Sequence, residues 1–109
     1  MHKVIYERLT TIARSGSTTT YGAIAPMANL NMGNTSDRAK IGRILEEISK
    51  TEDKAGRPML SAVVVRAGDG YPGSGFFDLA KRLGKYQGGD DLQFYVEELA
   101  RVHSYWREI

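Results

Sequence analysis

The sequence predicts a small α+β domain that is rich in helices and contains a two- or three-stranded antiparallel sheet. Three observations lead to this class. The chain has 109 residues, about the size of one domain. Apolar residues recur at helical spacing in several segments. One run only, Met59–Val65, has the apolar and β-branched composition of a buried strand.

The first third of the chain predicts two helices around a short extended piece. Residues 3–14 place Ile5, Leu9 and Ile12 on one helical face, and a glycine follows that can close the helix. Thr18–Tyr21 suits extended backbone. Gly22–Ala25 predicts a short helix with Thr20 as its N-cap, and Pro26 should kink or end it.

The middle of the chain predicts a third helix, the strand and a hairpin. Asn29–Thr35 is a loop, after which Ser36 or Asp37 can cap a helix that runs to about Glu52. The apolar positions of this helix follow the helical period: Ile41, Ile44, Leu45 and Ile48. Gly68–Gly70 is turn sequence that can fold the chain back on the strand as a hairpin.

Two further helices complete the prediction. The loop Tyr71–Gly75 leads to a helix with Phe76, Ala80 and Leu83 on one side, which Gly84–Gly89 ends. The last helix, from Asp90 to about Arg107, begins with acidic residues at its positive end. Its predicted apolar face consists of Leu92, Val96, Leu99, His103 and Trp106. The aromatic residues are assigned to helix packing rather than to base stacking.

Composition excludes several kinds of site. The chain has no cysteine and two histidines, His2 and His103, so we expect no metal site, no thiol nucleophile and no cofactor. His103 is interpreted as a histidine satisfied by the core. No apolar run is long enough to span a bilayer. Glu7 interrupts the start of the chain where a signal peptide needs apolar residues, so we expect a cytoplasmic protein.

Three segments resemble a known family. Thr19–Ala25, Arg38–Leu45 and Val64–Gly75 are similar to the DNA-binding domain of alkylguanine-DNA alkyltransferases and their alkyltransferase-like relatives. The resemblance implies one winged-helix domain over residues 1–109, with a core at about 1–75 and C-terminal helices at about 76–109. The Gly-Arg-Pro and Pro-Gly-Ser-Gly-Phe-Phe segments also resemble small uncharacterised bacterial proteins, which implies no chemistry.

The chain differs from this family in the strand that carries the family's reactive residue. The family's reactive strand reads Pro-Cys-His-Arg, or Pro-Trp-His-Arg in relatives without alkyl transfer, and here Leu60–Val63 reads Leu-Ser-Ala-Val. Ser61 therefore stands at the nucleophile position without a neighbouring base, and an unactivated serine is a poor nucleophile. We expect no catalytic residues and no enzymatic activity. The family's phosphate-contacting tyrosine falls on Tyr21, and its intercalating arginine falls one residue from Arg38.

The candidate DNA-contacting residues lie mainly on the third helix. Its outward-facing residues are in the first turns, the part of a recognition helix that contacts the major groove in helix-turn-helix proteins. They are Tyr21, Ser36, Arg38, Lys40, Arg43 and Arg66. The alternative is an ordinary solvated helix, because Glu46 and Glu47 follow and repel phosphate. The turn beside Arg66 serves equally as a wing or as a plain hairpin, and Asp69 at its tip has the wrong sign for phosphate.

A second candidate is an anion-binding loop formed by Gly73, Ser74 and Gly75, which open a helix with free N–H groups. The alternative is a tight turn with a serine cap. The sequence therefore predicts a non-enzymatic module that binds double-stranded DNA. Two alternatives remain: a protein-interaction or adaptor domain on the same fold, and a small-ligand or anion sensor that uses the Pro72–Gly75 loop.

Overall fold

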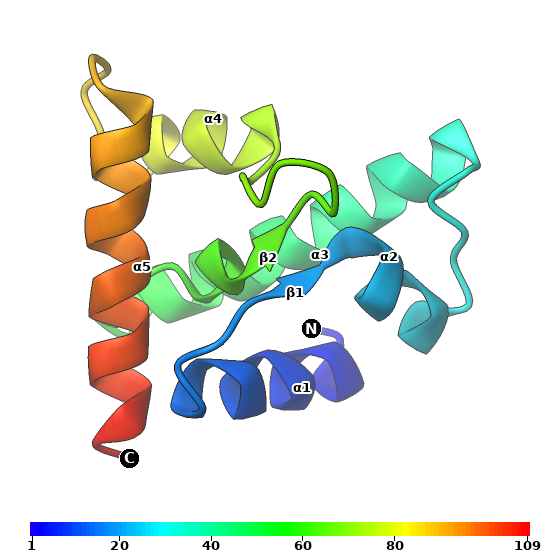
Figure 1. Cartoon of the computed structure of the whole chain (residues 1–109), viewed down its shortest axis with the longest axis horizontal. Helices are drawn as coiled ribbons and strands as arrows, with labels where there is room; N and C mark the ends of the chain where they lie inside the picture. Colours follow the sequence, from blue (N-terminus) through cyan, green and yellow to red (C-terminus); the bar gives the residue numbers. More distant parts are fainter.

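The computed structural model describes residues 1–109 and contains five α-helices, two 3₁₀ helices and two short strands (Figure 1). In chain order the elements are α1 (Lys3–Arg14), β1 (Thr19–Thr20), α2 (Tyr21–Ile24), η1 (Ala25–Ala28), α3 (Thr35–Lys54), η2 (Leu60–Val63), β2 (Val64–Val65), α4 (Ser74–Arg82) and α5 (Asp91–Arg107). The predicted α+β class with a small sheet is confirmed.

The sheet is parallel, so the predicted antiparallel sheet is wrong. Thr19 lies opposite Val64, and Thr20 lies opposite Val65. The Gly68–Gly70 turn does close, because Arg66 N–H donates to the Tyr71 carbonyl over 2.9 Å, but no strand follows it. The strand's partner comes instead from β1, which is separated from β2 by α2, η1, α3 and η2. Such a long crossover is what a parallel pair requires.

The first helix ends where the sequence predicts, and α2 is shifted by one residue from the predicted Gly22–Ala25. α1 has the predicted bounds, and Thr20 caps α2 by accepting from the Ala23 N–H over 3.1 Å. Pro26 ends the α-helical hydrogen bonding, and the chain continues as η1 because a proline is tolerated in the first turn of a helix.

The cap of α3 differs from the prediction. Asn34, and not Ser36 or Asp37, is the N-cap, and its side chain accepts from the Asp37 N–H over 3.0 Å. Asp37 lies within the first turn, and its carboxylate reaches back to accept from the Asn31 N–H over 3.0 Å. These two bonds satisfy donors at the start of the helix and hold the preceding loop against it.

The predicted strand Met59–Val65 is wrong for most of its length, since Leu60–Val63 forms η2 and only Val64–Val65 is a strand. The reason lies in the partners of its backbone N–H groups. Met59 N–H donates to the Glu98 carboxylate over 2.9 Å, and Ser61 N–H donates to the Ser49 hydroxyl over 3.1 Å. Side chains of α5 and α3 thus take the place of a neighbouring strand.

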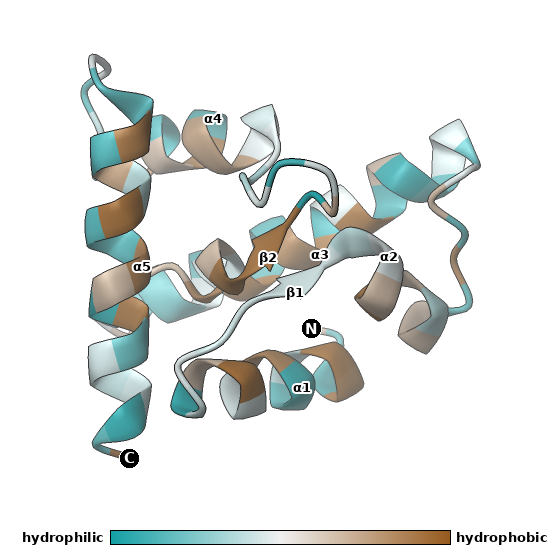
Figure 2. Ribbon diagram, in the orientation of Figure 1, coloured by the Kyte–Doolittle hydropathy of each residue, from teal (hydrophilic) through white to brown (hydrophobic).

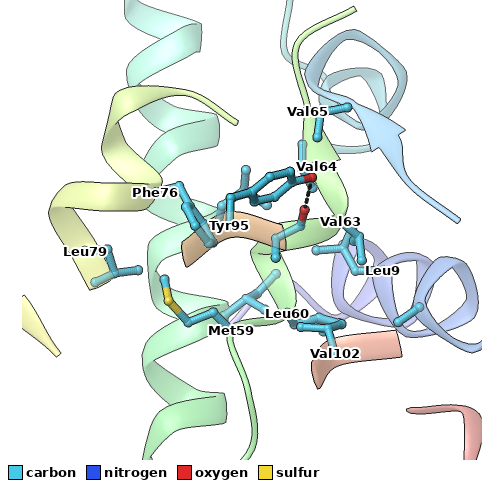
Figure 3. Packing of buried hydrophobic residues seen from close by; sticks show 14 of the residues in the cluster. Leu9, Met59, Leu60, Val63, Val64, Val65, Phe76, Leu79, Tyr95 and Val102 are labelled. Atoms are coloured by element: carbon cyan, nitrogen blue, oxygen red, sulfur yellow. Dashed lines mark hydrogen bonds between the residues drawn. The ribbon is translucent and has the colours of Figure 1, made fainter. Parts of the chain in front are cut away.

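This segment is the centre of the core (Figure 3). Every residue from Met59 to Val65 is buried, and η2 packs against α1, α3 and α5. Figure 3 shows Leu9 of α1, Val102 and Tyr95 of α5 and Leu79 of α4 around it. The Tyr95 hydroxyl donates to the Ala62 carbonyl over 3.1 Å, so α5 contacts the segment at both ends of η2.

The buried face of α5 also differs from the prediction. Leu92 and Val96 are exposed, Leu99 and His103 are half-buried, and only Trp106 of the predicted face is buried. The face that packs on the core consists of Phe94, Tyr95, Glu98, Val102 and Trp106. Aromatic packing decides the rotation of the helix, because Phe94 and Tyr95 pack on Phe76 of α4. The assignment of these aromatic residues to the core is confirmed.

The pair of serines that joins α3 to η2 gives a stability prediction. Ser49→Ala removes both the acceptor of the Ser61 N–H and the partner of the Ser61 hydroxyl, at a position with no solvent exposure. Leaving buried polar groups unpaired should lower the free energy of unfolding by about 1–3 kcal/mol, measured by urea denaturation.

The matched control is Thr51→Ala on the same helix, where the hydroxyl only bonds the Glu47 carbonyl. That variant should change stability by less than about 0.5 kcal/mol. Equal effects of the two substitutions would mean that the serine pair does not hold η2 in place.

Candidate functional site

A cleft of about 580 Å³ lies between α3, α4 and the loop that joins β2 to α4. Its lining includes seven of the nine candidate residues that the sequence indicates: Tyr21, Arg38, Arg43, Arg66, Gly73, Ser74 and Gly75. These residues come from three separate parts of the chain. The structure therefore brings the predicted DNA-contacting residues and the predicted anion-binding loop to one place.

One wall of the cleft is a face of α3. The residues on it are spaced as neighbours on a helix surface: Arg38, Ala39, Gly42, Leu45 and Glu46. An added Cβ at Gly42 would meet nothing within 4 Å, so the backbone of α3 is open to the cleft at this turn. Ala39 and Gly42 thus leave room between the arginine side chains.

The opposite wall is formed by α4 and by the loop before it. Gly75, Asp78, Leu79 and Arg82 share one face of α4 and line the cleft. The N-cap of α4 is Gly73, which has no side chain to bond the first N–H groups, and Ser74 is the first helical residue. The interpretation of Ser74 as a serine cap is therefore wrong.

Tyr21 fixes the loop of this wall to the sheet. Its hydroxyl accepts from the Gly73 N–H over 2.9 Å, across a sequence separation of 52 residues. Burial raises the pKa of Tyr21, so the hydroxyl is neutral at pH 7 and retains its own proton for donation to a ligand oxygen. A Cβ at Gly73 would lie 3.3 Å from the Tyr21 hydroxyl oxygen, a tight contact that would require the tyrosine to shift by a few tenths of an ångström.

The charges in the cleft are unequal in sign. Its lining holds four arginines (38, 43, 66 and 82) against two carboxylates (Glu46 and Asp78), an excess of +2. The chain as a whole also has a net charge of +2, so the residues outside the cleft are balanced overall. The lining thus carries a formal positive charge, part of which Asp69, outside the lining, compensates at Arg66.

The arginines differ in how far their charges are compensated. Arg82 pairs with Glu46 over 2.6 Å, and Arg66 pairs with Asp69 over 2.9 Å. The Arg82 hydrogen bond, with a second from Lys50, lowers the pKa of Glu46, so this carboxylate stays ionised near neutral pH. Arg38 bonds only the Thr35 hydroxyl, and Arg43 has no hydrogen-bond or ion-pair partner. Arg38 and Arg43 are thus the free cations of the site.

Two predicted residues lie outside the cleft. Ser36 is exposed on the first turn of α3, and Lys40 lines a more open hollow on the other side of that helix. Arg43 borders both hollows. Lys40 lies 4.0 Å from the Asp37 carboxylate, and Glu47 pairs with the N-terminal ammonium over 2.7 Å. Lys40 and Arg43 thus lie on the same exposed side of the helix.

Ser61, the residue that the family resemblance aligns with a nucleophile, lines the cleft. Its hydroxyl is the partner of the Ser49 hydroxyl over 2.7 Å. The two histidines make other contacts, since His2 caps α1 and a ring nitrogen of His103 lies 2.8 Å from the Ser17 carbonyl oxygen. His103 is half-buried at this contact.

The sequence analysis missed Gly42, Asp78 and Arg82 as cleft residues. A signal for them exists in the sequence. Gly75, Asp78, Leu79 and Arg82 follow the spacing of one helix face that begins in the predicted anion-binding loop. Following the helix face that starts at Gly75 would have included Arg82. That this face of α4 lies opposite α3 is known only from the tertiary structure, where Arg82 pairs with Glu46.

No group of three or more histidine, aspartate or glutamate side chains in residues 1–109 is arranged to hold a metal ion. None of the helices is both long enough and apolar enough to cross a membrane. No protein-family model, curated protein or solved structure matches the chain.

The contact between Tyr21 and the loop gives a second prediction. Tyr21→Phe removes the acceptor of the half-buried Gly73 N–H, so it should lower the free energy of unfolding by about 1 kcal/mol. It should also shift the backbone amide resonances of residues 72–75 in a two-dimensional NMR spectrum.

Tyr71→Phe is the matched control, because the Tyr71 hydroxyl makes no hydrogen bond and its ring packs beside Phe77 in a similar setting. It should leave both readouts nearly unchanged. If the Gly73 amide is unmoved in Tyr21→Phe, the loop is held by something other than the tyrosine.

Proposed function

We propose that the protein is a non-enzymatic module of winged-helix type that binds double-stranded DNA through the first half of α3 and the cleft beside it. The observation that carries the proposal is the pair of arginines without carboxylate partners, Arg38 and Arg43, in a cleft lining whose formal charge is +2. A phosphate backbone is attracted to such a site because each neutralised phosphate releases a counterion.

The geometry supports α3 as the helix that enters the major groove. Ser36, Lys40 and Arg43 are exposed on its first three turns, where helix-turn-helix proteins contact base edges. Asp37 in the first turn is engaged with the Asn31 N–H, which leaves Arg38 and Arg43 as the nearest free charges. An arginine in this place can donate two hydrogen bonds to a guanine.

The wall opposite α3 supports contacts to the backbone of the same duplex. Tyr21 offers a neutral hydroxyl, and the start of α4 offers N–H groups that no side chain caps. The turn around Gly68–Gly70 takes the place of the wing, and the ion pair between Arg66 and Asp69 reduces the repulsion that Asp69 alone would cause. Phosphate contacts of this kind position a protein without reading sequence.

The contacts of Ser61 support a binding rather than a catalytic role. A serine nucleophile needs a base within hydrogen-bond reach, and the group at that distance is the hydroxyl of Ser49. Alkyl transfer to Ser61 is accordingly not part of the proposal, and the resemblance to alkyltransferase-like proteins contributes only the mode of DNA binding.

Arg43→Ala tests the proposal directly. It should weaken binding of a fluorescent mixed-sequence duplex by about 1–3 kcal/mol if the guanidinium reads a base, and by less if it contacts phosphate. Fluorescence anisotropy is the measurement, and the affinity should fall steeply as salt is raised from ~50 mM to ~200 mM.

Arg8→Ala is the matched control, because Arg8 is an exposed arginine of α1 that has no ion pair and lines neither hollow. Lys81→Ala on α4 is a second control outside the cleft. Equal losses in the three variants would indicate diffuse charge attraction, and no duplex binding at ~50 mM salt would refute the proposal in favour of the adaptor reading.

Gly42→Leu separates binding from folding. A side chain at this position enters open space in the cleft, and leucine is a better helix former than glycine by about 0.8 kcal/mol. We therefore expect a variant with a raised melting temperature and a lowered affinity for duplex DNA. Unchanged affinity in this folded variant would show that DNA does not use the cleft.

A further inference from the structure

Arg82 is the one arginine of the cleft that is paired with a carboxylate of the cleft itself. Its guanidinium lies 2.6 Å from Oε1 of Glu46, so the contact joins the last turn of α4 to α3. Both residues line the cleft, and the Arg82 side chain is 56% exposed. The pair therefore lies at the surface of the cleft, where an anion that enters can reach the guanidinium.

Glu46 has a second cationic partner. Lys50 lies one turn further along α3, and its ammonium is 3.1 Å from the same Oε1 atom of Glu46. If Arg82 leaves, the carboxylate therefore stays paired, and its half-buried position does not become unfavourable. Arg82, in contrast, has no other hydrogen-bond or ion-pair partner.

We infer, on the basis of the proposed function, that Arg82 is a further phosphate-binding residue of the site and that Glu46 occupies it in the absence of DNA. When the duplex binds, the guanidinium moves from the Glu46 carboxylate to a phosphate oxygen. Glu46 then remains with Lys50.

The relative strength of the two interactions favours this exchange. An exposed ion pair between two side chains is weak, because water screens it and both side chains lose conformational freedom. A phosphate contact adds the release of a counterion from DNA, and a guanidinium can donate two parallel hydrogen bonds to a phosphate. A phosphate placed at this end of the cleft therefore competes with Glu46 for Arg82.

The position of the pair suits a strand that runs along the cleft. Arg38 and Glu46 are eight residues apart on α3, about 12 Å along the helix axis. Each DNA strand carries one phosphate for about 3.4 Å of duplex axis, so phosphates are present at both ends of this distance. Glu46, which on sequence grounds opposes DNA contact, is neutralised by Lys50 in the bound state.

A double-mutant cycle of duplex binding tests the exchange, with fluorescence anisotropy at ~50 mM salt as the measurement. Glu46→Gln keeps the size of the side chain and removes its charge. It should raise the affinity about three- to fivefold, which corresponds to the strength of an exposed ion pair. In the Arg82→Ala chain the same substitution should change the affinity less than about twofold, because Lys50 already compensates Glu46.

The salt dependence of binding shows whether Arg82 reaches a phosphate. The slope of log affinity against log salt should be smaller by about 0.9 in Arg82→Ala than in the original chain, because one phosphate contact is lost. The slope in Glu46→Gln should equal that of the original chain, because Arg82 contacts phosphate in both complexes. Circular dichroism should show all variants folded, since neither side chain belongs to the core.

Glu97→Gln is the matched control, because Glu97 is an exposed glutamate of α5 that has no ion pair and lines neither hollow. It removes the same charge and should change the affinity less than about twofold. An equal gain in Glu97→Gln, a gain in Glu46→Gln that persists without Arg82, or an unchanged slope in Arg82→Ala would each overturn the inference and leave duplex binding in place. Absence of duplex binding by the original chain would instead refute the proposed function, and this inference with it.

Discussion

Two side chains from different helices accept hydrogen bonds from backbone N–H groups of the buried segment at the centre of the molecule. Ser49 of α3 binds the Ser61 N–H, and Glu98 of α5 binds the Met59 N–H. Both acceptors are buried, with Ser49 at 0% and Glu98 at 2% exposure. Three partners offset the cost of burying the Glu98 carboxylate. They are the Met59 N–H and the side chains of Lys85 and Arg101, each of which lies 3.6 Å from a carboxylate oxygen. These contacts fix η2 as a 3₁₀ helix and set the positions of α3 and α5 around it.

The candidate site follows from this arrangement. The chain leaves η2 as β2, and the pairing of β2 with β1 brings Tyr21, directly after β1, to the loop that precedes α4. Arg82 of α4 then reaches Glu46 of α3 and closes the far end of the cleft. Figure 2 shows β2 in the brown of apolar residues. The cleft borders the core, because the core residues Ile41, Leu45, Phe76 and Leu79 also line it. Arg38 and Arg43 are left without carboxylate partners at its mouth.

The sequence predicts the helices well and the sheet poorly. The spacing of Ile5, Leu9 and Ile12 predicts α1, because the buried face of this helix is encoded in its own residues. The run Met59–Val65 looks like a strand because it is mostly apolar and ends in three β-branched valines. Two of its backbone N–H groups, however, donate to the side chains of Ser49 and Glu98 on α3 and α5. Likewise the rotation of α5 depends on aromatic contacts with α4, so periodicity alone selects Leu92 and Val96. The sequence identifies most of the candidate residues of the cleft one by one. That they line the same cleft depends on tertiary contacts, which the sequence does not reveal.

Amide hydrogen exchange of Met59 and Ser61 is the most direct measurement of the central claim. If Glu98 and Ser49 hold these N–H groups in the folded state, the two amides should exchange only when the whole domain unfolds, with protection equal to the global free energy of unfolding. The amide of the exposed Gly68, which donates no hydrogen bond within the protein, provides the unprotected reference in the same spectrum. Exchange of the Met59 and Ser61 amides at rates close to that of Gly68 would contradict the account, because η2 would then open without the helices around it.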